Sequence, residues 1–122
     1  MRTTILTALL VTALATPVLA QVYPVSGRWG ESNSAENGPI DCSGNRRIID
    51  FLGNQRTDSN GGVPEYRNVS VQSVGQTDYR IVDEFSNAMV SAGHTEYMLR
   101  KIDSDRIVMN QSGTVLNLRR CK

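Results

Sequence analysis

Polar and apolar residues alternate along most of this chain in short stretches. In one of them, Tyr79, Ile81 and Phe85 are separated by even numbers of residues and would share one face. A period of two places alternate side chains on opposite faces of a β-strand, so each stretch predicts a strand. The predicted strands cover residues 22–29, 46–52, 67–72, 79–85, 97–102, 106–109 and 114–120.

Turn-type residues separate these strands. Gly53-Asn54, Gly75-Gln76 and the clusters at 103–105 and 111–113 form short connections. A parallel crossover needs a dozen or more residues, so neighbouring strands are expected to be antiparallel. Longer polar loops are expected at residues 31–37 and 57–62, and residues 87–94 form either a long hairpin loop or a short helical turn. The prediction is an all-β fold, a small antiparallel up-and-down β-barrel of about 7–8 strands, because closure removes exposed edges.

The apolar positions of these strands supply enough side chains to fill such a barrel. The inward candidates are Ile49, Phe51, Val69, Val71, Tyr79, Ile81, Phe85, Tyr97, Leu99, Leu116 and Leu118. A barrel of eight short strands is about wide enough for its own side chains. A deep pocket for a large lipid is therefore not expected, whereas a shallow site at the mouth stays open.

The first 20 residues have the features of a secretory signal peptide. Arg2 supplies a positive start, residues 5–18 are mostly apolar, and Val18-Leu19-Ala20 is a small-residue cleavage site. The expected organisation is a cleaved signal at 1–20 and one domain at 21–122, in a periplasmic or secreted monomer without a membrane span. The whole chain has 13 basic and 12 acidic residues, and only Arg2 is lost, which leaves 12 of each. A balanced charge argues against a nucleic-acid partner.

Cys42 and Cys121 are the two cysteines, and in an exported chain they are expected to form one internal disulfide. Two free thiols or an intermolecular bridge are the alternatives.

His94 is the single histidine, so a zinc site is not expected, and residues 103–105 are expected to form a turn rather than a calcium site. Ser91, His94 and Glu96 lie near a loop tip without rigid support, so we expect no enzyme, no metal and no cofactor.

Gly27-Arg28-Trp29 on the first strand, with Arg119 and Arg120 on the last, resembles the calycin superfamily of lipocalin-like barrels. The resemblance implies that Trp29 closes one barrel end and that Arg119 or Arg120 packs across its ring, a cation–π contact. In size, export and cysteine count the chain is also similar to the exported protease inhibitors and lysozyme inhibitors of Gram-negative bacteria. The simpler alternative is that Trp29 is a core anchor.

A disulfide between Cys42 and Cys121 would bring two groups of basic residues near each other. The candidates for an anion-binding patch are Arg46, Arg47, Arg119, Arg120 and Lys122. Arginine's planar fork suits carboxylate and phosphate, so an anionic glycan or an acidic loop of a partner would fit. The alternative is a set of solvated arginines at strand ends.

The sequence favours an exported, non-enzymatic binding or inhibitor-type protein of the bacterial periplasm. It would act through barrel loops at 31–37, 57–62 and 87–94 on an envelope protein, a hydrolase or an envelope glycan, because loops on a rigid scaffold commonly carry function. The alternatives are a lipocalin-like carrier of a small apolar ligand at the barrel mouth and a structural envelope protein.

Overall fold

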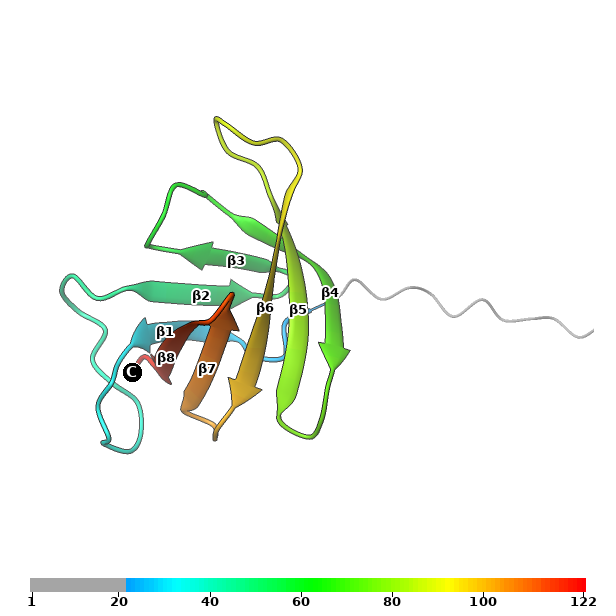
Figure 1. Ribbon diagram of the computed structural model, residues 1–122. Coiled ribbons are helices and arrows are strands. Elements are labelled where there is room, and N and C mark those ends of the chain that lie inside the picture. The colour runs from blue at the N-terminus through cyan, green and yellow to red at the C-terminus, as the bar shows by residue number, and fades with distance from the viewer. Residues whose placement is uncertain (1–21) are drawn as a thin grey trace, which may run out of the picture.

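The computed structural model describes residues 22–122, which form a closed antiparallel β-barrel (Figure 1). Each strand pairs with the next along the chain, and the last pairs with the first. The strands are β1 (Gly27–Glu31), β2 (Ile48–Leu52), β3 (Gln55–Asp58), β4 (Tyr66–Ser73), β5 (Asp78–Phe85), β6 (Gly93–Lys101), β7 (Arg106–Gln111) and β8 (Thr114–Arg120). The predicted all-β, up-and-down barrel is confirmed.

The signal peptide predicted at 1–20 lies outside the described residues, and no helix among residues 22–122 is long and apolar enough to cross a membrane.

The barrel interior is filled by side chains at every second strand position. The buried apolar core consists of Tyr23, Trp29, Ile49, Phe51, Ile81, Tyr97, Leu99, Ile107, Met109, Leu116 and Leu118. Most of the predicted inward residues belong to this core, and Val71 and Tyr79 pack against it partly buried. Phe85 is only half-buried and contacts the Tyr66 ring, 5.6 Å between centroids, at the end of the ladder.

Val69 was predicted to point inward, and this prediction is wrong. A β-bulge between Asn68 and Ser70 shifts the register of β4 against β5. A bulge places two residues opposite one, so the alternation along the strand changes phase. Asn68 is therefore buried, and Val69 is 44% exposed.

The first strand begins five residues later than the pattern predicted. Residues 22–26 do not join the sheet; they cross one barrel end, where Tyr23 enters the core and its N–H donates to the carbonyl of Gly53. Pro24 has no N–H for a sheet ladder, and Gly27 has a positive φ of 86° that redirects the chain into β1. This segment therefore plugs the barrel instead of extending its wall.

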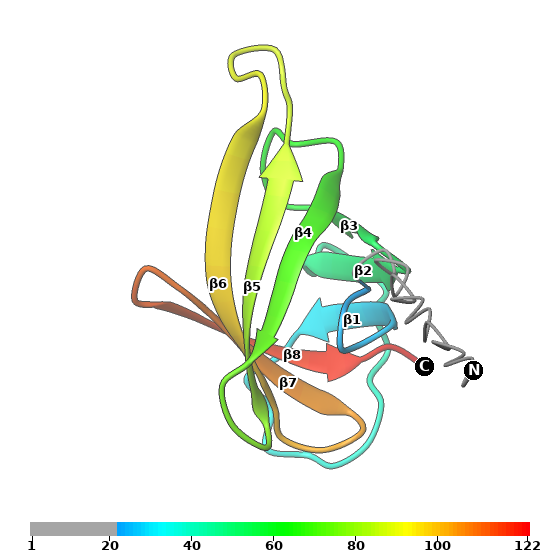
Figure 2. The ribbon, with the colours of Figure 1, turned by 90° about the vertical axis from the view of Figure 1, so that its right-hand side faces the viewer.

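Two predicted loops also differ in extent. Thr57 and Asp58 lie in β3 instead of the flexible segment, paired with Asp50 and Ile49 of β2. Residues 87–94 contain no helical turn: they form a hairpin loop, and Gly93 and His94 already belong to β6. The long β5–β6 hairpin extends beyond the rest of the barrel in both ribbon views (Figures 1 and 2).

The β1–β2 connection, residues 32–47, packs along the outside of β8, and we refer to it as the strap. Ile40 and Cys121 form a parallel bridge, and the predicted disulfide Cys42–Cys121 is present. Gly30 makes this approach feasible, because a Cβ there would lie 2.8 Å from the Cys42 sulfur and 2.8 Å from the Arg46 side chain. The disulfide closes a sequence separation of 79 residues, so it fastens the strap and the C-terminal strand together.

Candidate functional site

The β5–β6 loop, residues 86–92, is the most prominent projection of the barrel (Figure 2). Met89 at its tip is 91% exposed, and Val90 is 41% exposed. An isolated exposed apolar residue is ordinary on a protein surface. A nearly fully exposed methionine at the end of a projecting hairpin presents an apolar, adaptable side chain to a partner.

Local hydrogen bonds hold this loop in one conformation. The backbone N–H groups of Met89 and Val90 donate to the Asn87 side-chain oxygen at 2.9 and 2.7 Å, and the Asn87 N–H donates to the Val90 carbonyl at 2.9 Å. At the base, a Cβ on Gly93 would lie 2.7 Å from the Phe85 ring, so the loop closes tightly on that ring. These contacts restrict the conformations that the loop can adopt.

A charged cluster occupies the barrel interior between β3, β4 and β5. Asp83 is fully buried and accepts hydrogen bonds from Arg56 Nε at 2.9 Å, from the Tyr23 hydroxyl at 2.9 Å and from Asn68 Nδ2 at 3.3 Å. The Arg56 guanidinium also lies over the rings of Tyr66 and Tyr97, 3.9 and 5.0 Å from the centroids. These groups place a hydrogen-bonded ion pair at the centre of the barrel, which makes the interior less apolar than a lipid-binding cavity.

The cluster perturbs the two buried tyrosines. Burial, together with the charge of Asp83 and its hydrogen bond, raises the pKa of Tyr23 far above its usual value of 10. Burial and the same carboxylate raise the pKa of Tyr97 well above that value. Both hydroxyls therefore stay protonated across the physiological pH range, and neither is available as a base.

Trp29 and Arg120 lie in contact at one end of the barrel. The Arg120 guanidinium lies 4.4 Å from the centroid of the Trp29 ring, and both side chains donate to the Ser26 carbonyl, at 3.1 Å from Trp29 Nε1 and 3.2 Å from Arg120 Nη1. Of the two arginines that the resemblance allowed, Arg120 makes this contact. Gly27 adjoins it: a Cβ there would lie 3.5 Å from Arg120 Nη1.

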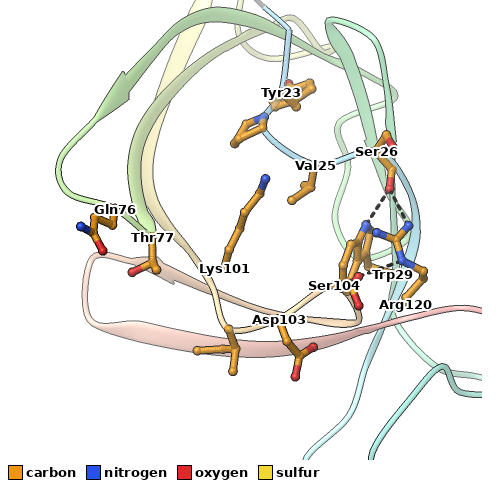
Figure 3. Close-up of a pocket in the computed structure, with 12 residues that line it drawn as sticks. Tyr23, Val25, Ser26, Trp29, Gln76, Thr77, Lys101, Asp103, Ser104 and Arg120 are labelled. Carbon is orange, nitrogen blue, oxygen red and sulfur yellow. Dashed lines mark hydrogen bonds between the residues drawn. The ribbon is translucent and has the colours of Figure 1, made fainter.

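A depression of about 550 Å³ opens at the same end (Figure 3). Tyr23, Val25 and Trp29 line it with apolar surface, and the Lys101 side chain extends into it toward Tyr23. Gln76 and Thr77 form part of the rim. The depression is shallow and mixed in polarity, which suits a small amphipathic molecule better than a long hydrocarbon.

The structure does not gather the five basic residues of the predicted anion patch into one open surface. Arg47 forms a two-pronged ion pair with Asp58, with nitrogen–oxygen distances of 3.0 and 2.7 Å, and Arg46 donates to the Glu31 carbonyl. Arg120 stacks on Trp29 and contacts Asp105 at 3.5 Å, and Lys122 is exposed beside the disulfide. Arg119 is only 2% exposed. Several of these arginines therefore already have a protein partner.

The residues considered for catalysis lie on the outer surface. His94 is 56% exposed and 3.9 Å from Glu84, and Ser91 is exposed in the β5–β6 loop. Residues 103–105 form the expected turn, in which the Asp105 N–H donates to Asp103. Among residues 22–122, no group of three or more histidine, cysteine, aspartate or glutamate side chains is placed to hold a metal ion.

The interior charge cluster was not predicted from the sequence. Asp83 lies between Ile81 and Phe85 at every second position of β5, so the pattern placed a carboxylate on the side of the strand that faces the core. Its partner Arg56 lies in a strand of four residues that the pattern did not identify. The sequence signal for a buried charge cluster was therefore an acidic residue on the inward face of a strand, without an identifiable basic partner.

Comparisons with protein-family models, with curated proteins and with solved structures find no match for this chain.

Proposed function

We propose that this protein is an exported, non-enzymatic binding protein of inhibitor type, which docks its β5–β6 loop on an envelope protein or hydrolase. The observation that carries the proposal is the projecting, internally hydrogen-bonded loop with Met89 91% exposed at its tip. A loop ordered in advance loses less conformational entropy on binding, so more of the contact energy is available for affinity.

Two further observations support a binding role. The barrel core and its charge cluster give the loop a rigid base, because β5 and β6 pair along their full length from Asp78↔Arg100 to Phe85↔Gly93. The disulfide suits an oxidising compartment such as the periplasm, in which a partner of the same envelope would be encountered.

The test is a pull-down of the oxidised chain, residues 21–122, from the producer's envelope fraction, followed by titration of the retained protein. Met89→Asp should weaken that binding at least about tenfold, because a charge would replace an apolar contact at the interface. Leu52→Asp is the matched control: Leu52 is an apolar residue, 74% exposed, at the β2–β3 turn, and its change should leave affinity unaltered.

Asn87→Ala gives a graded second test. It removes the side-chain oxygen that accepts two backbone N–H groups, so the tip should lose order and bind several-fold more weakly while Met89 is retained. Equal affinity of the Met89 and Leu52 variants, with both unchanged from wild type, would rule out docking through this loop. Retention of nothing at all would favour a structural envelope protein.

A second candidate function is supported by the depression beside Trp29. A small amphipathic ligand held there would contact the single tryptophan of the chain, so its binding should change the fluorescence of Trp29. Titration with an apolar fluorescent probe, repeated with Lys101→Met, separates this carrier function from loop docking. A response that Met89→Asp leaves intact would assign ligand binding to the barrel end.

A further inference from the structure

Arg119 is the least satisfied charged group among the described residues. It lies on β8 between Gly30 of β1 and Arg106 of β7, its cross-strand partners. Its neighbours Leu118 and Arg120 have their side chains toward the barrel core and the Trp29 end, so Arg119 points to the outer face beneath the strap. Only 2% of Arg119 is exposed.

The guanidinium has no hydrogen-bond partner within residues 22–122. Nε, Nη1 and Nη2 of Arg119 are all buried and all unpaired. Arginine is almost never fully buried unless it is paired, because a desolvated charge is costly without a counter-charge. Arg56 illustrates the usual arrangement: it is also buried, and the Asp83 carboxylate contacts it at 2.9 Å.

Two acidic residues beside β7 are already paired with other arginines. Asp103 pairs with Arg106 at 2.8 Å, and Asp105 contacts Arg120 at 3.5 Å. Across residues 22–122, no carboxylate lies within 4.0 Å of an Arg119 nitrogen, the distance that defines an ion pair here. The positive charge of Arg119 is thus uncompensated in a region sealed by the strap.

A groove of about 430 Å³ adjoins this charge, between the strap and the outer face of β7 and β8. Its polar lining, besides Arg119, is Ser32, Asn33, Ser34, Arg106 and Asn117, and its apolar lining is Ile102, Ile107, Val108 and Leu118. The hydroxyl oxygens of Ser32 and Ser34 accept backbone N–H groups, which leaves their O–H groups free to donate. The polar part of the lining therefore combines the unpaired Arg119 and the Asp103-paired Arg106 with hydroxyl and amide donors.

We propose that this groove is a binding site for a small oxyanion, a carboxylate or phosphate group, held by the Arg119 guanidinium. The planar fork of arginine matches two oxygens of such a group, and the buried position strengthens the interaction because little water screens it. Since the guanidinium nitrogens are sealed from solvent, entry requires local movement of the strap at Ser32–Ser34, an exposed to half-buried segment.

The test is thermal unfolding of the oxidised chain, followed by Trp29 fluorescence, in millimolar phosphate, acetate or chloride at matched ionic strength. Phosphate or acetate should raise the midpoint by about 5 °C once its concentration is well above Kd, and chloride should not. Protection by acetate alone would assign the site to a carboxylate, such as a partner's acidic side chain. Protection by phosphate alone would assign it to a phosphate group.

Arg119→Met supplies the decisive comparison. It keeps an unbranched apolar stem and removes the charged guanidinium, so the oxyanion-dependent shift should disappear while the midpoint in chloride stays at or above that of wild type. Arg80→Met is the control, because Arg80 is an exposed arginine paired with Glu96, and its variant should keep the full shift.

Two results would overturn the proposal. One is a wild-type midpoint that responds to oxyanions no more than to chloride, a measurement that does not depend on any variant folding. The other is an Arg119→Met protein that keeps the oxyanion response, which would place the ions elsewhere on the barrel.

Discussion

The buried pair Arg56–Asp83 gives the sharpest prediction about stability. Asp83 is 0% and Arg56 4% exposed, and removing one partner of a buried ion pair usually costs about 3–5 kcal/mol because the other charge is left desolvated. The stability cost of Asp83→Asn should lie near the lower end of this range, about 3 kcal/mol, because Asp58 lies 3.9 Å from Arg56 and compensates part of its charge. Arg56→Met should cost a similar amount, because it strands the Asp83 carboxylate and uncovers the Tyr97 ring.

The double variant Arg56→Met with Asp83→Asn should be less destabilised than the sum of the two single variants. It contains no unpaired charge, so the coupling energy should be about 2–3 kcal/mol. Urea unfolding followed by Trp29 fluorescence measures all three, because Trp29 is the single tryptophan and is 1% exposed in the folded state. At the usual urea dependence of about 1–3 kcal/mol per molar, a loss of 3–4 kcal/mol lowers the midpoint by roughly 2 M.

Arg80→Met is the matched control for this cycle. Arg80 of β5 and Glu96 of β6 form an exposed ion pair on the outer surface, and losing it should cost under about 1 kcal/mol. A cost below about 1 kcal/mol for Asp83→Asn, or strictly additive single variants, would refute the reasoning that the cluster is a desolvated, mutually dependent unit.

Two further predictions concern the disulfide and alkaline pH. Replacing Cys42 and Cys121 together by alanine should lower the free energy of unfolding by up to about 4 kcal/mol, measured by urea titration, because the loop of 79 residues no longer restricts the unfolded chain; a loss near zero would contradict this. Tyr23 and Tyr97 have raised pKa values in the folded protein, so the unfolded chain loses their protons first as the pH rises. Their contribution to the free energy of unfolding is therefore complete below the unfolded pKa of about 10. Above that pH it falls by up to about 1.4 kcal/mol per pH unit for each tyrosine. Tyr23→Phe should reduce that slope above about pH 10, and an unchanged slope there would exclude Tyr23 as a source.

Much of the candidate site could be anticipated only in outline. The polar stretch at 87–94 was recognisable as a connection, but its rigidity depends on the Asn87 side chain and on the fit of Gly93 against Phe85. Arg119 was one of several clustered basic residues in the sequence, and nothing in the chain order separates it from Arg120. The two have opposite environments because adjacent strand residues face opposite sides of the barrel wall.

The all-β class, the antiparallel meander and the pairing of the two cysteines follow from the amino-acid order alone, because period-two patterning, short turns and cysteine count are local or counting properties. The contacts of the buried polar groups follow only from the folded barrel. Tyr23, Arg56 and Asp83 come from segments up to 60 residues apart, and their hydrogen bonds exist only once the barrel has closed. The strap covers Arg119 for the same reason: its position follows from closure of β1 against β8, an interaction between the two ends of the domain that no local pattern contains.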